Sequence, residues 1–185
     1  MKKPIVIYSS KRGSTKQYAE WIAEELSCEA VSFEESYNIN LYEYDFIIYG
    51  GWIRGSGIVD FDKFTQSFDD ELLKRLIVFG VGIANPSAEN YMQVWSFSIG
   101  KIDSRNEHKI ILYLLEGTYD PGKVTGLDKF LMFIMKKVLI SGSTKDSMEQ
   151  ARKMQDRIER GIDLVKRENI DGILKDTRKI LNGAK

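Results

Sequence analysis

The sequence has little that could cross-link the chain or bind a metal ion. Its 185 residues include one cysteine, Cys28, and one histidine, His108. One cysteine excludes an internal disulfide, and one histidine excludes a histidine-rich metal cluster. We therefore predict no metal site and interpret both side chains as structural or incidental. Because disulfides are rare in a reducing cytoplasm, we expect a cytoplasmic location.

Net charge and long apolar runs are also absent. Lys and Arg together number 27, as do Asp and Glu, which argues against a nucleic acid as the main partner. No run reaches the roughly 20 apolar residues that cross a membrane. The first apolar run ends at Tyr8, too early for a signal peptide. With 43% hydrophobic and 29% charged residues, the composition is that of a globular protein.

The most informative stretch lies near the N-terminus. Residues 5–8 predict a buried strand, and apolar residues at helical spacing between 19 and 26 predict a helix. The first turn of such a helix points free N–H groups at the preceding loop, residues 9–15, and these groups suit a phosphate. The loop is neither a P-loop nor a three-glycine dinucleotide fingerprint. The alternative is a turn that binds nothing and is capped by Ser14 or Thr15.

Two later apolar strands also end in glycine-bearing loops. Residues 46–49 lead into 50–57, residues 76–81 lead into 82–85, and a fourth strand is predicted at 109–115. Strands that are apolar on both faces belong to a parallel sheet covered by helices on each side. Ligands of such sheets bind at the carboxyl ends of the strands, so the loops predict one shared site.

The other predicted elements are a short edge strand and several helices. The strand is expected at residues 29–33. The helices are expected at 61–68, from Asn85-Pro86 through Tyr91 to residue 99, from Thr144 to Val165, and, either as a helix or partly disordered, at 170–181. We predict an α/β fold with one domain at residues 1–168, a helical insert at 127–142 and a C-terminal extension at 169–185.

The first stretch resembles a known signature. The series Val6-Ile7-Tyr8, Ser10, Gly13, Thr15, Ala19 and Ile22 resembles the phosphate signature of the FMN-binding flavodoxins, and the likeness spans most of residues 3–168. It implies a three-layer, doubly wound sandwich with a five-stranded parallel sheet of strand order 2-1-3-4-5. It also implies FMN as the cofactor.

The resemblance implies a set of cofactor-binding residues in the three loops. We expect them to be Ser10, Lys11, Arg12, Gly13, Ser14, Thr15, Gly51, Trp52, Ile53, Arg54, Gly55, Gly82, Ile83, Ala84 and Asn85, with a further contribution from residues 116–119 left open. Lys11 and Arg12 either pair with the phosphate or face water. Either Trp52 or Arg54 covers the flavin ring, since indole and guanidinium planes both stack. No residue is identified as a catalytic acid, base or nucleophile.

Two features resemble the flavodoxin-type, menaquinone-dependent protoporphyrinogen oxidases. They are Gly50-x-x-Ile53-Arg54 and the stretch Asp128-Lys129-Phe130-Leu131 with its apolar, lysine-containing continuation. This resemblance implies an FMN-dependent oxidoreductase, with quinone-linked oxidation of a porphyrinogen-like substrate. The alternatives are an electron carrier without its own substrate and, more distantly, a flavin-free binding module. Flavodoxin-type carriers are typically acidic, so the zero net charge of this chain argues against a carrier.

The segment 127–140 carries the expectations about partners. An apolar helix with three lysines is either a core or homodimer-interface element or a surface that contacts a membrane peripherally. The other expected partners are a redox protein or a small-molecule substrate such as a quinone.

Overall fold

The computed structural model describes residues 3–84, 86–123, 152 and 155–182. The predicted insert at 127–142, Asn85 and the predicted helix start at Thr144 lie outside these residues.

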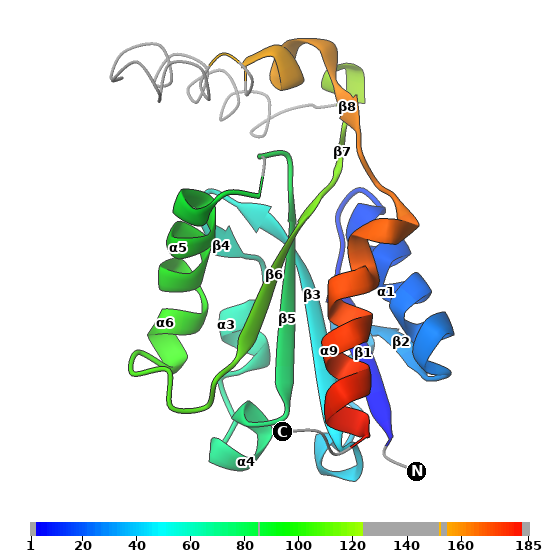
Figure 1. Cartoon of the computed structure of the whole chain (residues 1–185), viewed down its shortest axis with the longest axis vertical. Helices are drawn as coiled ribbons and strands as arrows, with labels where there is room; N and C mark the ends of the chain where they lie inside the picture. Colours follow the sequence, from blue (N-terminus) through cyan, green and yellow to red (C-terminus); the bar gives the residue numbers. More distant parts are fainter. Residues whose placement is uncertain (1–2, 85, 124–151, 153–154, 183–185) are drawn as a thin grey trace.

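A parallel sheet forms the centre of the fold, as the sequence predicts (Figure 1). Its spatial order is β2-β1-β3-β5-β6, which is 2-1-3-4-5 when the parallel strands are counted along the chain. The strands are β1 (Pro4–Ser9), β2 (Glu29–Ser32), β3 (Phe46–Arg54), β5 (Leu76–Gly82) and β6 (Ile111–Glu116). A short strand, β4 (Gly57–Ile58), pairs antiparallel with the end of β3.

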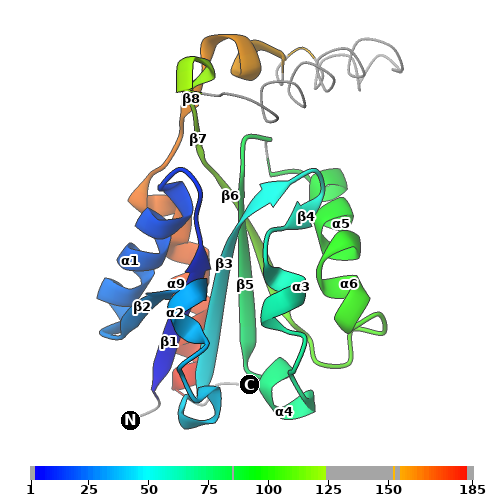
Figure 2. The ribbon, with the colours of Figure 1, turned by 180° about the vertical axis from the view of Figure 1, so that it is seen from behind.

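Helices cover both faces of the sheet (Figures 1 and 2). One face carries α1 (Ser14–Leu26) and α9 (Asp171–Leu181). The other carries α2 (Phe33–Ser36), α3 (Phe61–Phe64), α4 (Asp70–Leu73), α5 (Ala88–Phe97) and α6 (Ile99–Ile102). Successive strand residues point to opposite faces, so Ile5 and Ile7 are in one core cluster and Val6 is in the other. The three-layer architecture is confirmed.

Helix α9 is part of the second core cluster. Ile170 and Ile173 are fully buried and pack in the same cluster as Val6 and Ile22. The 3-10 helix η3 (Arg167–Ile170) precedes α9, and two others are η1 (Leu41–Glu43) and η2 (Pro121–Lys123). Residues 171–181 therefore form a helix rather than a disordered segment, while the domain boundary at residue 168 stays a prediction.

The expected loop at 50–57 is wrong in its first half. Strand β3 continues through both glycines to Arg54 and turns back into β4. A Cβ atom on Gly50 would lie 2.0 Å from Cζ of Phe79, so the glycine lets β3 and the Phe79 ring pack closely. The glycines here serve packing of the sheet as well as a turn.

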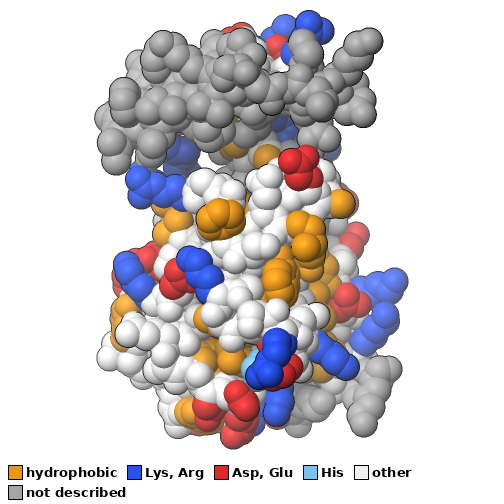
Figure 3. All heavy atoms as spheres, turned by 90° about the vertical axis from the view of Figure 1, so that its left-hand side faces the viewer, with side chains coloured by type: hydrophobic (Ala, Val, Ile, Leu, Met, Phe, Trp, Pro, Cys, Tyr) orange, Lys and Arg blue, Asp and Glu red, His pale blue; other side chains and the backbone are white. Residues whose placement is uncertain are grey.

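Two helix predictions also need correction at their ends. Helix α3 is a single turn and ends at Phe64 instead of residue 68. The helix expected from Asn85-Pro86 begins at Ala88, because the hydroxyl of Ser87 accepts the N–H of Asn90 and caps it. Its exposed face includes Tyr91, Met92 and Phe97, and hydrophobic patches are visible from this side (Figure 3).

The helix expected to reach Val165 ends earlier. Residues 155–160 are helical, and Gly161, with φ of 79°, ends that helix. Strand β8 (Ile162–Asp163) follows and pairs antiparallel with β7 (Thr118–Tyr119) beyond the end of β6 (Figure 1). Among the described residues, no helix has the length and apolar character needed to cross a membrane.

Candidate cofactor site

A pocket of about 380 Å³ lies at the carboxyl ends of β1, β3, β5 and β6. Its volume is within the range of cofactor and small-molecule sites. The structure brings most of the predicted residues together in its lining: Ser10, Lys11, Arg12, Ser14, Thr15, Trp52, Ile53, Arg54, Gly55, Gly82, Ile83 and Ala84. The three predicted loops thus do share one site.

Two predicted residues do not line the pocket, and Asn85 lies outside the described residues. Gly13 is the residue before α1 and has φ of 98°, a left-handed conformation that glycine adopts without strain. Gly51 packs against the hairpin: a Cβ atom there would lie 2.4 Å from Cγ2 of Ile58. Both glycines shape the backbone around the pocket.

The N-terminus of α1 supplies hydrogen-bond donors at one end of the pocket. In an α-helix the N-cap amide and the next three amides have no intrahelical acceptor. Here the amide of Gly13 donates to the Ser10 hydroxyl at 3.2 Å, which leaves the amides of Ser14, Thr15 and Lys16 for a ligand. The positive end of the helix dipole adds to them. The alternative in which Ser14 or Thr15 caps the helix is wrong, because Gly13 is the N-cap and has no side chain to accept a bond.

Hydrogen bonds between segments hold the pocket in shape. The amide of Thr118 donates to the Ser14 hydroxyl at 3.2 Å, and the amide of Gly117 donates to the carbonyl of Gly82 at 2.7 Å. These two bonds connect the start of α1 to the end of β6, and the end of β6 to the end of β5. The start of α1 and the far wall of the pocket are therefore fixed relative to each other.

The first strand is connected in the same way to the hairpin side. The Ser9 hydroxyl donates to Oδ2 of Asp60 at 2.7 Å, and Oδ1 of Asp60 accepts from Lys63 at 3.1 Å. Asp60 follows β4 and has φ of 60°. Its carboxylate is therefore held by a hydroxyl, that of Ser9, and by an ammonium group, that of Lys63. This pairing fixes the loop that begins after β1.

The β3–β4 hairpin forms a second wall. The amide of Ile58 donates to the hydroxyl of Ser98 at 2.9 Å. Ser98 is the residue between α5 and α6, so this bond attaches the hairpin to the junction of the two helices. The side chain of Ile53 lies over β5, because Gly80 and Gly82 have no Cβ there: such atoms would lie 3.1 Å and 3.3 Å from Cδ1 of Ile53. This apolar packing holds the wall close to the strand ends.

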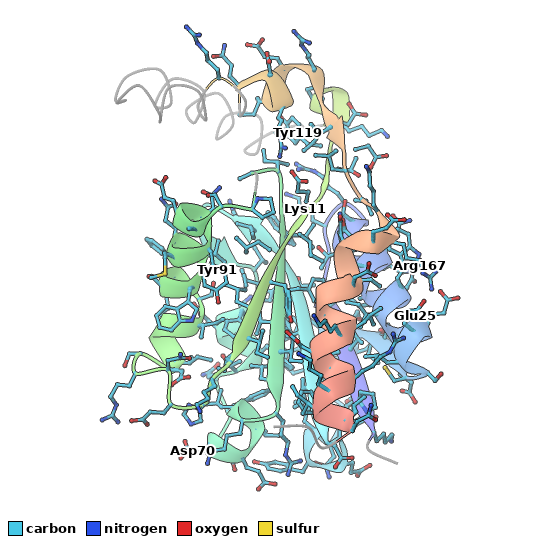
Figure 4. The ribbon with its side chains drawn as sticks, viewed as in Figure 1. Lys11, Glu25, Asp70, Tyr91, Tyr119 and Arg167 are labelled. Carbon is cyan, nitrogen blue, oxygen red and sulfur yellow. The ribbon has the colours of Figure 1, made fainter. Side chains whose placement is uncertain are left out.

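The two cations of the loop at residues 9–15 lie beside aromatic rings of the pocket. Lys11 Nζ is 5.5 Å from the centroid of the Trp52 ring, and Cζ of Arg12 is 5.9 Å from the centroid of the Tyr119 ring. Figure 4 shows Lys11 and Tyr119 at the same end of the sheet. Cations at such distances are attracted to the ring face. The cations thus link this loop to the hairpin on one side and to β7 on the other.

The lining also contains residues that sequence reasoning did not identify. They are Ser56, Val81, Asn90, Gln93, Val94, Leu114 and Leu115, together with Gly117, Thr118 and Tyr119 from the segment that was left open. The pairing of Val81 with Leu115 brings the end of β6 beside β5, and a signal for it was the fourth predicted strand. The sequence held no comparable signal for Asn90 and Gln93, whose position depends on how α5 packs.

A buried tyrosine of α1, Tyr18, contacts the end of β6 next to the pocket. The hydroxyl of Tyr18 donates to the carbonyl of Glu116 at 2.7 Å and accepts from the side-chain amide of Asn169 at 2.7 Å. Burial raises the pKa of Tyr18, so the phenol stays protonated and able to donate. The contact fixes the end of β6 against α1.

Most of the sequence matches the model of a known protein family. A model of the flavodoxin domain matches residues 5–146. The chain belongs to the flavodoxin domain family. No protein of curated function matches this flavodoxin domain.

Several solved structures are similar to this flavodoxin domain. A flavodoxin from the domain Archaea has 18% identity and a TM-score of 0.43, and the alignment covers 85% of this chain and 97% of the other. The Trp repressor binding protein from Bacillus subtilis has 16% identity and a TM-score of 0.46, with 89% and 99% covered. Oxidised flavodoxin 2 from Bacillus cereus has 16% identity and a TM-score of 0.42, with 85% and 99% covered.

The cofactor of this flavodoxin domain is FMN, and the pocket fits it. Three helix-terminal amides and the hydroxyl of Thr15 suit a phosphate, which carries two negative charges. The remaining lining includes apolar side chains such as Ile53, Val81 and Leu115, which suit a flat aromatic ring. The family and the pocket together establish a flavin-binding redox protein.

Proposed function

We propose that the protein is an FMN-dependent oxidoreductase that binds a small-molecule substrate against the flavin. The observation that carries this proposal is the division of the pocket. Phosphate-binding groups lie on the α1 side, whereas Ser56, Asn90 and Gln93 add polar groups on the α5 side. Helices α1 and α5 cover opposite faces of the sheet (Figure 1). Ser56, Asn90 and Gln93 are the groups that we propose contact a second molecule on this side of the pocket.

In this proposal the phosphate loop is the main anchor of the cofactor. The amides of Ser14, Thr15 and Lys16 donate to phosphate oxygens, and the hydroxyls of Ser10 and Thr15 add two donors. A hydrogen bond to a charged group contributes about 1.5–3 kcal/mol. Lys11 and Arg12 lower the electrostatic energy of the phosphate dianion from the mouth of the loop. FMN should therefore bind far more tightly than riboflavin, which lacks the phosphate.

Trp52 is the residue we propose to cover the flavin ring. Both Trp52 and Arg54 line the pocket, but Trp52 is half-buried, whereas Arg54 is exposed at the hairpin tip. The Lys11 ammonium lies 5.5 Å from the centroid of the Trp52 ring. On the opposite side of the pocket from Trp52, the lining includes residues 82–84 and 117–119, whose backbone groups we propose face the edge of the flavin ring. When bound, FMN supplies the electron acceptor and donor, and these walls exclude water from it.

The first experiment is a titration of purified protein with FMN and with riboflavin. Binding quenches flavin fluorescence and shifts the absorption spectrum. We expect a tight complex with FMN and a much weaker one with riboflavin. Protein that stays colourless in excess FMN would refute the proposal.

The finer assignment is quinone-linked oxidation of a porphyrinogen-like substrate. Its support is the resemblance of Gly50-x-x-Ile53-Arg54 and of residues 128–131 to the menaquinone-dependent oxidases, together with zero net charge. The test is anaerobic photoreduction of the FMN complex followed by addition of menadione. Rapid reoxidation, with conversion of protoporphyrinogen to its fluorescent product, supports the assignment. No reaction with either compound, but fast exchange with a redox protein, would favour an electron carrier.

A peripheral membrane contact and a homodimer belong to the same finer proposal. Both rest on the apolar, lysine-containing sequence at 127–140. Co-sedimentation with liposomes, with and without anionic lipid, tests the first, and sedimentation velocity tests the second. Failure to bind either kind of liposome would remove the membrane contact.

A further inference from the structure

We infer that Arg157 is a positioning residue that sets the orientation of the Ile83–Ala84 peptide at the pocket wall. This inference rests on the proposed flavin site and adds a residue to it. Arg157 lies beyond residues 5–146, the stretch that the flavodoxin domain model matches. It belongs to the helical residues 155–160, which stand above the carboxyl end of the sheet (Figure 1).

The guanidinium of Arg157 joins two strand ends. Its Nη1 donates to the carbonyl oxygen of Ile83 at 2.8 Å, and its Nη2 lies 2.8 Å from Oε1 of Glu116. Ile83 follows β5, and Glu116 is the last residue of β6. The planar fork of an arginine suits such a two-point contact, which a lysine cannot reproduce.

Burial makes this ion pair stronger than an ordinary surface pair. The side chains of Arg157 and Glu116 are only 18% and 25% exposed. Solvent screens charges at this level of exposure less than it does on an open surface. By contrast, Arg160 on the same helical stretch is 81% exposed and lies 4.0 Å from Asp156. Arg160 therefore offers a matched control.

The contact with Ile83 fixes the direction of a neighbouring amide. In a planar trans peptide the C=O and the following N–H point in opposite directions. Because Arg157 holds the carbonyl of Ile83, the N–H of Ala84 points away from Arg157. Ile83 and Ala84 line the pocket, whereas Arg157 does not. In this inference the amide of Ala84 is the group directed at the pocket, where a flavin ring has hydrogen-bond acceptors.

The test compares FMN and riboflavin binding in three variants. Arg157→Met removes the donors and the charge but keeps much of the apolar stem. We expect it to weaken both flavins by the same factor, about 3- to 10-fold, which is the loss of one neutral hydrogen bond. Arg157→Lys should give a smaller loss, and Arg160→Met should give none. An unchanged ratio of FMN to riboflavin affinity assigns the effect to the ring end of the pocket.

A second measurement separates positioning from a general loss of stability. Glu116→Gln keeps the size of the side chain but leaves the Arg157 charge without its partner. Uncompensated positive charge favours the more negative, reduced flavin, so we expect the midpoint potential to rise, with no such change in Arg160→Met. If Arg157→Met does not fold, Arg157→Lys and Glu116→Gln carry the test.

Three outcomes would overturn the inference. They are affinities of Arg157→Met equal to wild type for both flavins, a loss confined to FMN, and a Glu116→Gln potential equal to wild type. Failure of the wild-type protein to bind FMN would instead refute the proposed function. The two failures are therefore distinguishable.

Discussion

Replacing Thr15 with valine tests the proposed phosphate anchor directly. Thr15 is 2% exposed, lies in the first turn of α1 and lines the pocket. Valine has nearly the same shape and keeps the backbone amide, so the change removes one hydroxyl donor. If that hydroxyl binds the phosphate, the loss is about 1.5–3 kcal/mol, or roughly 10- to 150-fold in FMN affinity.

The assay is fluorescence titration of the variant with FMN and riboflavin, side by side. Riboflavin has no phosphate, so its affinity should not change. Thr65→Val is the matched control: Thr65 is also buried and donates its hydroxyl to the carbonyl of Phe61 at 2.9 Å, outside the pocket lining. We expect Thr65→Val to lower the free energy of unfolding by about 0.5–1.5 kcal/mol and to leave both flavin affinities unchanged.

Two results would refute the reasoning about Thr15. Equal losses for FMN and riboflavin would show that the substitution disturbs the whole pocket rather than a phosphate contact. An FMN affinity equal to wild type would show that the Thr15 hydroxyl does not contribute, and the anchor would then consist of the backbone amides and the Ser10 hydroxyl.

Three further predictions concern the frame around the site. Gly50→Ala would place a Cβ atom 2.0 Å from the Phe79 ring, so we expect the free energy of unfolding in urea to fall by about 1–3 kcal/mol; an unchanged midpoint would contradict it. Thr177 is fully buried, and its hydroxyl has no hydrogen-bond partner within the described part of the chain, so Thr177→Val should raise that free energy by about 1 kcal/mol in the same assay. Burial raises the pKa of Cys28 to about 11, from an ordinary value of 9.0, so iodoacetamide should alkylate it about 100-fold more slowly than an ordinary thiol at pH 8, with the rate rising toward pH 11. Alkylation at the ordinary rate at pH 8 would count against a buried thiol.

Much of the fold follows from local patterns in the sequence. The run at residues 5–8 is apolar on both faces because it lies between two layers of helices. The helical spacing of Ala19 and Ile22 matches the buried side of α1. Glycines at the strand ends mark the edge where a ligand binds. Such patterns repeat within a few residues, so they can be recognised without knowing which distant segments touch.

The error in the predicted loop after β3 comes from contacts between distant segments. Strand β3 contains Gly50 at a position where a side chain would occupy the space of the Phe79 ring in the neighbouring strand. The hairpin is held by Ser98, 40 residues away from its partner Ile58 in the sequence. No local pattern contains either contact, so the loop prediction at residues 50–57 failed.

The sequence alone determined the class of the fold, the edge of the sheet that carries the site and the position of the loop before α1, because periodicity and turn chemistry are local properties. Only the tertiary structure decided which side chains complete the pocket. Arg157 reaches the carbonyl of Ile83 across 74 residues of sequence, and Asn90 lines the pocket through the packing of α5. These positions are set by how helices pack on the sheet, and packing depends on contacts that the order of residues does not display.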